Sequence, residues 1–333
     1  MKNRRITVLF FVLGATLLFV QLRQFGIGRL VGDAVSAGWI LVPVILLFGL
    51  VHACDAEAWR AILAGEPERP RWAQLYRMVV AGSALNFLTP MVNVGGEPFK
   101  LATLSPFLGV QRSAGAVLIR NVARALGLLS FWLAAILTGW FLLPPEPWIR
   151  GPLVVAAAAI VGLILLLIRA HRRGGLDRWF DRLASWPGIG RLMRRIESIR
   201  PTLASIDQQI TGFARERPGS LALATGFEFL GRAVFVLEYC LIGRAIGVPI
   251  SYPIAFTIGG LEILAGNILF FVPYEIGTRE TSTVLLFSQL GLPPEAGLFA
   301  ALVSRLRDLA WITAGVMLTG IGSRTAAAPS VTP

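Results

Sequence analysis

The sequence predicts an all-α fold, a polytopic membrane helix bundle built from two inverted repeats, each with a broken or re-entrant helix. Three observations lead to this fold class: the composition, the recurrence of long apolar stretches, and a motif that occurs twice. Of the 333 residues, 55% are hydrophobic and only 15% are charged. A water-soluble domain of this length could not bury so much apolar surface, so lipid has to act as its solvent.

Apolar stretches recur along nearly the whole chain. The hydrocarbon core of a bilayer is about 30 Å thick and needs about 20 apolar residues per helical span. We expect complete or partial spans at 6–22, 38–54, 76–89, 113–143, 151–168, 220–243, 252–272 and 296–322. Tryptophans near the ends of these stretches predict an interfacial aromatic belt; they include Trp39, Trp59, Trp72, Trp140 and Trp148.

The first apolar stretch, 6–22, follows the basic residues Lys2, Arg4 and Arg5. A cleaved signal peptide also begins in this way, and it is the alternative reading. However, the apolar core is longer than the roughly 7–15 residues usual for a signal peptide, and no clear Ala-x-Ala site follows. We therefore expect a first membrane helix in a bacterial-type cytoplasmic (inner) membrane, with the N-terminus in the cytoplasm.

Much of the net charge of +12 lies in one segment between spans, from Arg169 to Arg217, which has eleven arginines and five acids. An excess of basic residues marks the cytoplasmic side of a membrane protein, so this charge does not indicate nucleic-acid binding. Apolar residues at helical spacing lie opposite the arginines. Two interpretations remain open: an amphipathic helix on an anionic leaflet surface, or a helix packed on the cytoplasmic ends of the bundle.

A motif in the first half of the chain is repeated in the second half. Asn-Phe-Leu-Thr-Pro-Met-Val-Asn-Val-Gly-Gly-Glu-Pro-Phe-Lys at 86–100 is echoed by Phe-Phe-Val-Pro-Tyr-Glu-Ile-Gly-Thr-Arg-Glu at 270–280. Each copy has a proline seven residues before a glutamate, then a Leu-Gly pair, then an arginine thirty-four residues after the proline. These residues are Pro90, Glu97, Leu108, Gly109 and Arg124 in the first copy, and Pro273, Glu280, Leu290, Gly291 and Arg307 in the second.

The repeated motif predicts an ancestral duplication and sets the expected domain organisation. The expected parts are an N-terminal helix and loop at 1–37, membrane repeat 1 at 38–168, a cytoplasmic basic segment at 169–218, membrane repeat 2 at 219–322, and a disordered tail at 323–333.

After each motif the apolar run extends for only about ten residues, which is too short to cross a membrane. Such a broken or re-entrant helix is tolerated at membrane depth only where it faces protein or a wet cavity. A cytoplasmic N-terminus and a cytoplasmic basic segment require an even number of membrane crossings between them. The sequence has five clear apolar stretches there, so one crossing is missing. A pair of half-helices within 85–113 would supply the sixth. The two motifs would then enter the bilayer from opposite faces, as in inverted-repeat transporters.

Ionisable residues inside apolar spans are the candidate functional residues, because a charge at mid-membrane costs about 2.5–3.5 kcal/mol even on insertion scales. Glycines before Glu97 and Glu280 indicate helix starts, whose amides suit an anion such as phosphate, and guanidinium groups bind phosphate bidentately. The expected substrate-binding residues are Asn86, Gly95, Gly96, Glu97, Lys100, Arg120, Arg124, Gly277, Thr278, Arg279, Glu280, Arg305, Arg307 and Asp308.

Other interpretations of these charges stay open. The acids Glu97, Glu280 and Asp308 would, in the alternative, only neutralise the arginines in structural pairs. Glu228 and Arg232, four residues apart, are interpreted as an intrahelical pair rather than a site. The role of Glu262 is ambiguous.

On both copies of the motif, from Pro90 through Gly95-Gly96-Glu97 to Arg124 and from Pro273 to Arg307, the chain resembles the lysylphosphatidylglycerol synthase transmembrane family of flippase-like proteins. The resemblance covers most of 38–322. It implies a bundle with re-entrant helices that moves a phospholipid or another amphipathic lipid between leaflets. Bifunctional members add a soluble aminoacyl-transferase domain after the membrane part. The chain ends at Pro333, so we do not expect the synthase reaction.

The resulting hypothesis is a lipid flippase or transporter that moves an anionic or otherwise polar-headed lipid through a central charged cavity. The expected partners are membrane lipids with a phosphate-bearing headgroup and the anionic leaflet surface, and a homo-oligomer stays open. A membrane-embedded enzyme or an accessory scaffold of lipid metabolism is the alternative. The sequence contains no metal-ligand cluster, nucleophile with base, or nucleotide loop, so we expect no cofactor and no enzymatic reaction.

Overall fold

The computed structural model describes residues 38–88, 95–173, 212–213, 215–269, 272 and 275–322. All regular secondary structure in these ranges is helical, which confirms the predicted all-α class. The expected first membrane helix, most of the basic segment and the C-terminal tail lie outside the described residues. The motif prolines, Pro90 and Pro273, also lie outside them.

Helices of the first half follow the expected apolar stretches closely. They are η1 (Gly38–Ile40), α3 (Leu41–Ile62), α4 (Trp72–Leu88), α5 (Gly96–Leu108), α6 (Val110–Leu142) and α7 (Pro147–Arg173). The helices of the second half are α11 (Pro218–Phe235), α12 (Leu237–Ala245), α13 (Tyr252–Ile268), α14 (Thr278–Gln289) and α15 (Pro294–Gly322).

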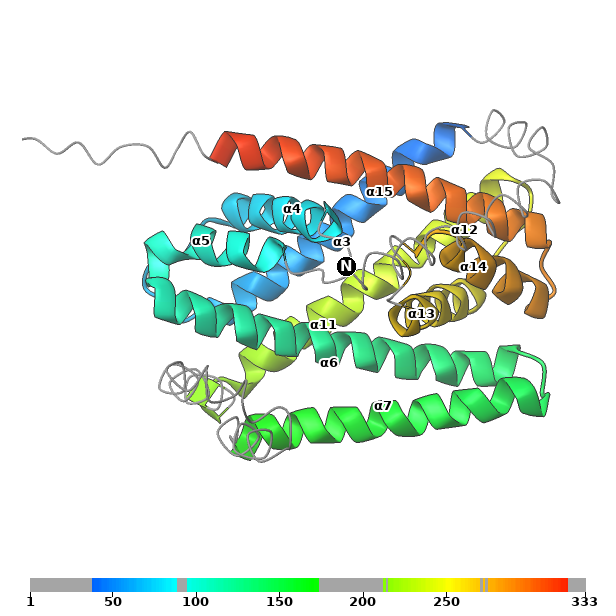
Figure 1. The fold of residues 1–333 in the computed structure, drawn as a ribbon, viewed down its shortest axis with the longest axis horizontal. Helices are drawn as coiled ribbons and strands as arrows, with labels where there is room; N and C mark the ends of the chain where they lie inside the picture. Colours follow the sequence, from blue (N-terminus) through cyan, green and yellow to red (C-terminus); the bar gives the residue numbers. More distant parts are fainter. Residues whose placement is uncertain are drawn as a thin grey trace, which may run out of the picture.

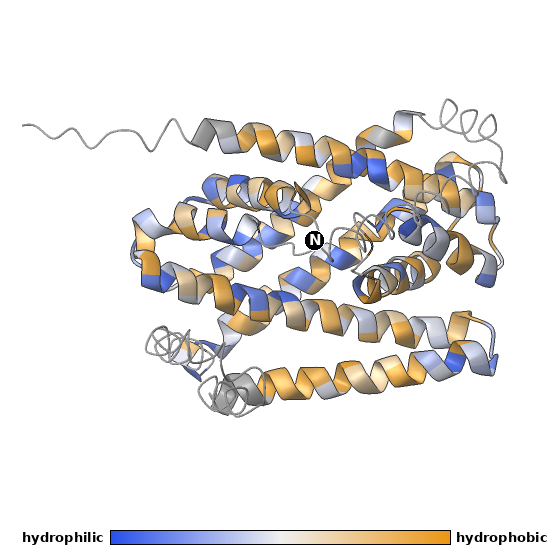
Figure 2. Cartoon of the chain, in the orientation of Figure 1, coloured by the Kyte–Doolittle hydropathy of each residue, from blue (hydrophilic) through white to orange (hydrophobic). Residues whose placement is uncertain are grey.

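Four helical stretches of the described chain are long and apolar enough to cross a membrane. They are Gly38–Ile62, Val110–Leu142, Pro147–Ile168 and Pro218–Ala245. Helix α15 is also long, with 29 residues, but it has Arg305, Arg307 and Asp308 near its middle. Figure 2 shows this hydrophilic patch partway along an otherwise apolar helix.

The same order of helices occurs in both halves of the chain. In each half a helix of 17 residues is followed by a break, a short helix of 13 or 12 residues, and a long helix. The two long helices, α6 and α15, run in opposite directions across Figure 1. The short helices α5 and α14 agree with the expected broken elements in length. The duplication, its inversion and the domain boundaries drawn from it stay predictions.

The bundle is closed by contacts between the halves. Helix α3 packs against α11, α4 against α15, and α6 against α13, while α7 lies beyond α6 at the edge (Figure 1). Large apolar side chains remain exposed along α7, among them Val155 at 70% and Leu165 at 61%. An exposed apolar surface of this extent is typical of a lipid-facing helix.

Small residues allow α6 and α13 to approach closely. A Cβ atom placed on Gly260 of α13 would lie only 2.1 Å from Cβ of Ala135 on α6. We therefore expect Gly260→Ala to lower the free energy of unfolding by about 1–3 kcal/mol through overpacking. Adding Ala135→Gly should recover most of this loss. Unfolding in mixed micelles measures both effects, and Gly162→Ala on α7, where the structure has open space, is the matched control.

One tryptophan departs from the expected interfacial belt. Trp39 and Trp148 are exposed, at 65% and 58%, as a belt requires. The interpretation is wrong for Trp59, which is only 1% exposed and lies 5.8 Å from the guanidinium carbon of Arg120. Its position near the end of an apolar stretch suggested the interface, but α3 continues to Ile62 and buries this turn in the core.

Candidate functional site

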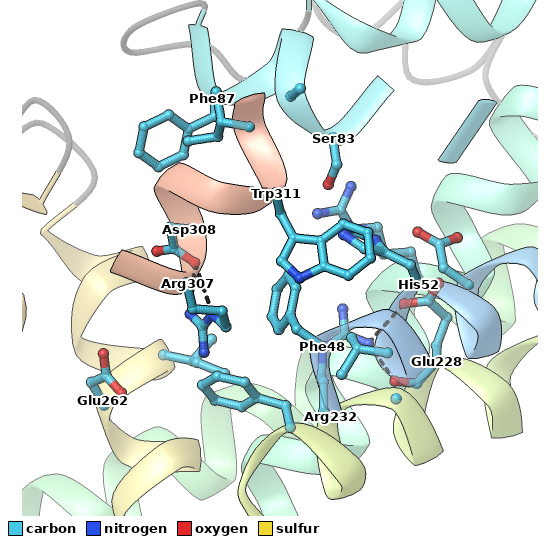
Figure 3. Close-up of a pocket in the computed structure, with 18 of the residues that line it drawn as sticks. Phe48, His52, Ser83, Phe87, Glu228, Arg232, Glu262, Arg307, Asp308 and Trp311 are labelled. Carbon is cyan, nitrogen blue, oxygen red and sulfur yellow. Dashed lines mark hydrogen bonds and ion pairs between the residues drawn. The ribbon is translucent and has the colours of Figure 1, made fainter. Parts of the chain in front are cut away.

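A cavity of about 380 Å³ lies inside the bundle, and both halves of the chain line it (Figure 3). Its walls come from α3, α4, α6, α11, α13, α14 and α15. The charged residues of the lining are four arginines and four acids: Arg124, Arg232, Arg279, Arg307, Asp55, Glu228, Glu262 and Asp308. The volume lies within the range of about 300–1,000 Å³ typical of small-molecule sites.

A first charge network joins α3, α6 and α11 on one side of the cavity. Arg120 of α6 contacts the carboxylates of both Asp55 and Glu228. Glu228 also accepts a hydrogen bond from Nη1 of Arg232, at 2.7 Å. Glycine at position 127 allows α11 to approach α6 closely enough for these contacts, because an added Cβ atom there would lie only 2.4 Å from Cβ of Glu228. Arg120 is therefore held between two helices with 3% of its surface exposed.

A second network is centred on Arg307 of α15. Its guanidinium group contacts the carboxylate of Glu238 and, through Nη2 at 2.6 Å, Oδ1 of Asp308. The guanidinium carbon also lies 4.3 Å from the ring centroid of Phe48 and 5.2 Å from that of Phe235. Cation–π contacts of this kind supplement the ion pairs. Figure 3 shows Arg307 beside Asp308, with Phe48 nearby.

Arg279 at the start of α14 extends the second network. Its Nη1 contacts Oδ2 of Asp308 at 2.7 Å, its Nη2 contacts Oε2 of Glu275 at 3.1 Å, and its Nε lies 3.3 Å from Oε1 of Glu262. Glu262 accepts a further hydrogen bond from the hydroxyl group of Tyr239. Helices α12, α13, α14 and α15 all contribute to this network.

At each of the two helix starts that the sequence assigned to an anion, one glycine amide already has a partner within the protein. The amide of Gly96 donates to Oδ1 of Asn86 at 2.7 Å, and the amide of Gly277 donates to Oε2 of Glu280 at 2.8 Å. Glu280 is the third residue of α14, a position at which a carboxylate commonly accepts a hydrogen bond from the backbone amide of the N-cap residue, here Gly277. Neither glycine lines the cavity.

Several other expected site residues form pairs beside the cavity instead of lining it. Nζ of Lys100 lies 2.8 Å from Oε1 of Glu97. Nε of Arg305 contacts Oε1 of Glu280 at 2.9 Å, and its Nη2 donates to the carbonyl of Glu275. These pairs agree with the neutralising role that the sequence left open. The expected site residues that do line the cavity are Arg124, Arg279, Arg307 and Asp308.

Sequence reasoning missed several lining residues. The pair of Glu228 and Arg232 is confirmed, but both side chains also face the cavity. Their position inside an apolar stretch was the available signal. Asp55 lies just beyond the end of the expected span 38–54, so it was not expected among the charged residues inside the membrane. The aromatic lining, with Phe48, His52 and Trp311, has no signature in the sequence (Figure 3).

Arg124 differs from the other three arginines of the lining. Arg232, Arg279 and Arg307 are each paired with a carboxylate. Across the residues that the structure describes, Arg124 has no hydrogen-bond or ion-pair partner. It is exposed, and it lies four residues, about one helical turn, after the buried Arg120. The cavity therefore presents one guanidinium group that has no direct ion-pair partner among the described residues.

An apolar helix bundle that encloses paired and unpaired charges defines an integral membrane protein with an internal polar site. The family model described as "Lysylphosphatidylglycerol synthase TM region" matches residues 6–315, so the chain belongs to this family, and the resemblance noted from the motifs is confirmed. Two proteins of Methanothermobacter thermautotrophicus, both named "UPF0104 membrane protein", are similar to it. One is 25% identical over 91% of each chain. The other is 26% identical over 92% of this chain and 90% of its own.

Proposed function

We propose that the protein is a lipid flippase or transporter that moves an anionic or otherwise polar-headed lipid between the leaflets of a bacterial-type inner membrane. The headgroup passes through the central cavity while the acyl chains stay in the bilayer. The observation that carries this proposal is the unpaired guanidinium group of Arg124 in a cavity lined by both halves of the chain. Membership of a lipid-related membrane family supports it.

Electrostatics favour a ligand with a negative group at this position. An ionisable side chain inside a membrane protein is costly, and it marks a functional site by default. A phosphate oxygen that accepts hydrogen bonds from Arg124 would neutralise the charge and match the planar guanidinium fork. The paired arginines around the cavity add hydrogen-bond donors without adding net positive charge, because each of them contacts a carboxylate. The cavity thus suits a phosphate that also bears polar substituents.

Alternating access is the mechanism that this architecture supports. Helices α6 and α15 run in opposite directions, and α3, α4 and α6 of the first half face α11, α13 and α15 of the second across the cavity (Figure 1). We propose that the halves are inverted repeats and that rocking of one against the other opens the cavity to each leaflet in turn. A cytoplasmic N-terminus and a basic segment on the anionic leaflet complete the proposed topology.

Reconstitution in liposomes tests the proposed function. We expect the purified protein to accelerate leaflet exchange of fluorescent lipids with a phosphate-bearing headgroup, relative to protein-free liposomes and to liposomes with heat-inactivated protein. A lipid with an uncharged sugar headgroup should exchange more slowly than the phosphate-bearing lipids. Unchanged exchange across the whole panel would contradict transport and would favour an enzyme or a scaffold.

A further inference from the structure

Acidic side chains outnumber basic ones in the second network. Four carboxyl groups surround the two guanidinium groups of Arg279 and Arg307; they belong to Glu238, Glu262, Glu275 and Asp308. Counted over these six described residues, full ionisation would give the cluster a net charge of minus two. Ions removed from water need compensation, so the cluster favours the binding of a proton or another cation.

Within the second network, Glu262 is the buried carboxyl group whose negative charge is least compensated by a nearby arginine. Glu238 contacts Arg307 and accepts a hydrogen bond from the hydroxyl of Ser304 at 2.5 Å, and Asp308 contacts both arginines at 2.6 and 2.7 Å. The ion pair of Glu262 with Arg279, at 3.3 Å, is longer than these contacts, although its side chain is only 8% exposed. The side chain of Glu275 is 36% exposed and therefore better solvated. Of these two, only Glu262 lines the cavity.

The groups that face Glu262 come from several elements. Helix α12 contributes the hydroxyl of Tyr239, α14 contributes Arg279, the turn before α14 contributes Glu275, and α15 contributes Asp308. Helix α6 also packs against α13, but its residues 125–142 include no acidic or basic side chain. Glu262 therefore has one cationic neighbour and two acidic ones, and its ionisation depends on Arg279.

We propose that Glu262 binds and releases one proton in each transport cycle, so that lipid movement is coupled to proton movement; this inference rests on the proposed function. A carboxylate oxygen of Glu262 takes a proton from cavity water and forms an O–H bond, which weakens its ion pair with Arg279. That bond breaks when the proton returns to water on the other side, and the ion pair forms again. Within the described ranges, no group of three histidine, cysteine or acidic side chains is placed to hold a metal ion.

A pH gradient across proteoliposomes tests the coupling. One pH unit corresponds to about a tenfold ratio for a single transferred proton, so tight coupling should distribute the labelled lipid about tenfold unequally between leaflets. Glu262→Gln should abolish the asymmetry, so that whatever exchange remains is equal with and without the gradient. A gradient response that survives Glu262→Gln, or wild-type asymmetry that follows a sodium gradient at equal pH, would overturn the proposal.

Infrared difference spectroscopy gives a readout that does not depend on lipid transport. During a pH titration of the purified protein, wild type should show a C=O stretching band of a protonated carboxyl group that disappears in Glu262→Gln. Glu238→Gln, which alters another buried acid of the same network, should keep the band. If the band persists in Glu262→Gln, the proton site is wrong even if lipid exchange occurs. If the band behaves as expected but no lipid moves, the proposed function fails instead.

Discussion

Arg120→Ala is expected to lower the free energy of unfolding by about 3–5 kcal/mol, because it leaves two carboxylates in the bundle interior without their shared cation. Arg120 is 3% exposed and contacts both Asp55 and Glu228, so α3, α6 and α11 all lose a common contact. Unfolding in mixed detergent micelles, followed by the fluorescence of the neighbouring Trp59, measures the loss.

A matched control separates burial from charge in this prediction. Arg60 on α3 pairs with Glu57 at 2.7 Å, but its side chain is 60% exposed, so Arg60→Ala should cost no more than about 1 kcal/mol. The double variant Arg120→Met, Asp55→Asn should recover much of the stability, because Glu228 keeps its ion pair with Arg232 and no buried charge is then left alone. If Arg120→Ala were as stable as Arg60→Ala, the buried network would not hold the helices together.

Arg124→Ala is expected to slow leaflet exchange about ten- to hundredfold with little change in stability. A hydrogen bond to a charged group contributes about 1.5–3 kcal/mol, and each 1.4 kcal/mol corresponds to about a factor of ten in rate. Because Arg124 has no partner among the described residues, its removal leaves no carboxylate uncompensated. Exchange of a phosphate-bearing lipid in liposomes, measured beside micelle unfolding, checks both parts of the prediction.

Arg112→Ala is the control for that variant, since it removes the same residue type from the same helix. The Arg112 side chain is 69% exposed and lies outside the central cavity, with a 3.7 Å contact to Glu66. Arg124→Lys should be intermediate, because an ammonium group keeps the charge but not the bidentate fork. Equal exchange rates for Arg124→Ala and Arg112→Ala would exclude Arg124 from headgroup binding.

Much of the fold could be predicted because helix length and apolarity report directly on the membrane. The expected stretch 113–143 became α6, and the short runs after each motif became α5 and α14. The breaks between helices are also encoded locally. Glycines such as Gly109 and Gly277 lie at these breaks and have positive φ angles of 77° and 78°. These features depend on neighbouring residues, so one sequence is enough to find them.

The site could be predicted only in part, because it depends on which helix faces meet. Arg279 and Arg307 were expected and do line the cavity, but Asp55 and Glu228 join them only because α3 packs on α11. The spacing of Glu228 and Arg232 fits an isolated pair as well as a cavity wall. Conversely, Gly96 and Gly277 have the pattern of an anion site, yet Asn86 and Glu280 take their amides.

Photo-crosslinking shows directly whether a lipid headgroup occupies the cavity. A phospholipid with a photoreactive group on its headgroup is incorporated into membranes with the protein, and the labelled peptides are identified by mass spectrometry. If the headgroup occupies the cavity, label should appear in cavity-lining segments, around Ser83 and Phe87 of α4 and around Trp311 of α15 (Figure 3). Labelling confined to helix ends and to lipid-facing residues such as Leu165 would contradict it.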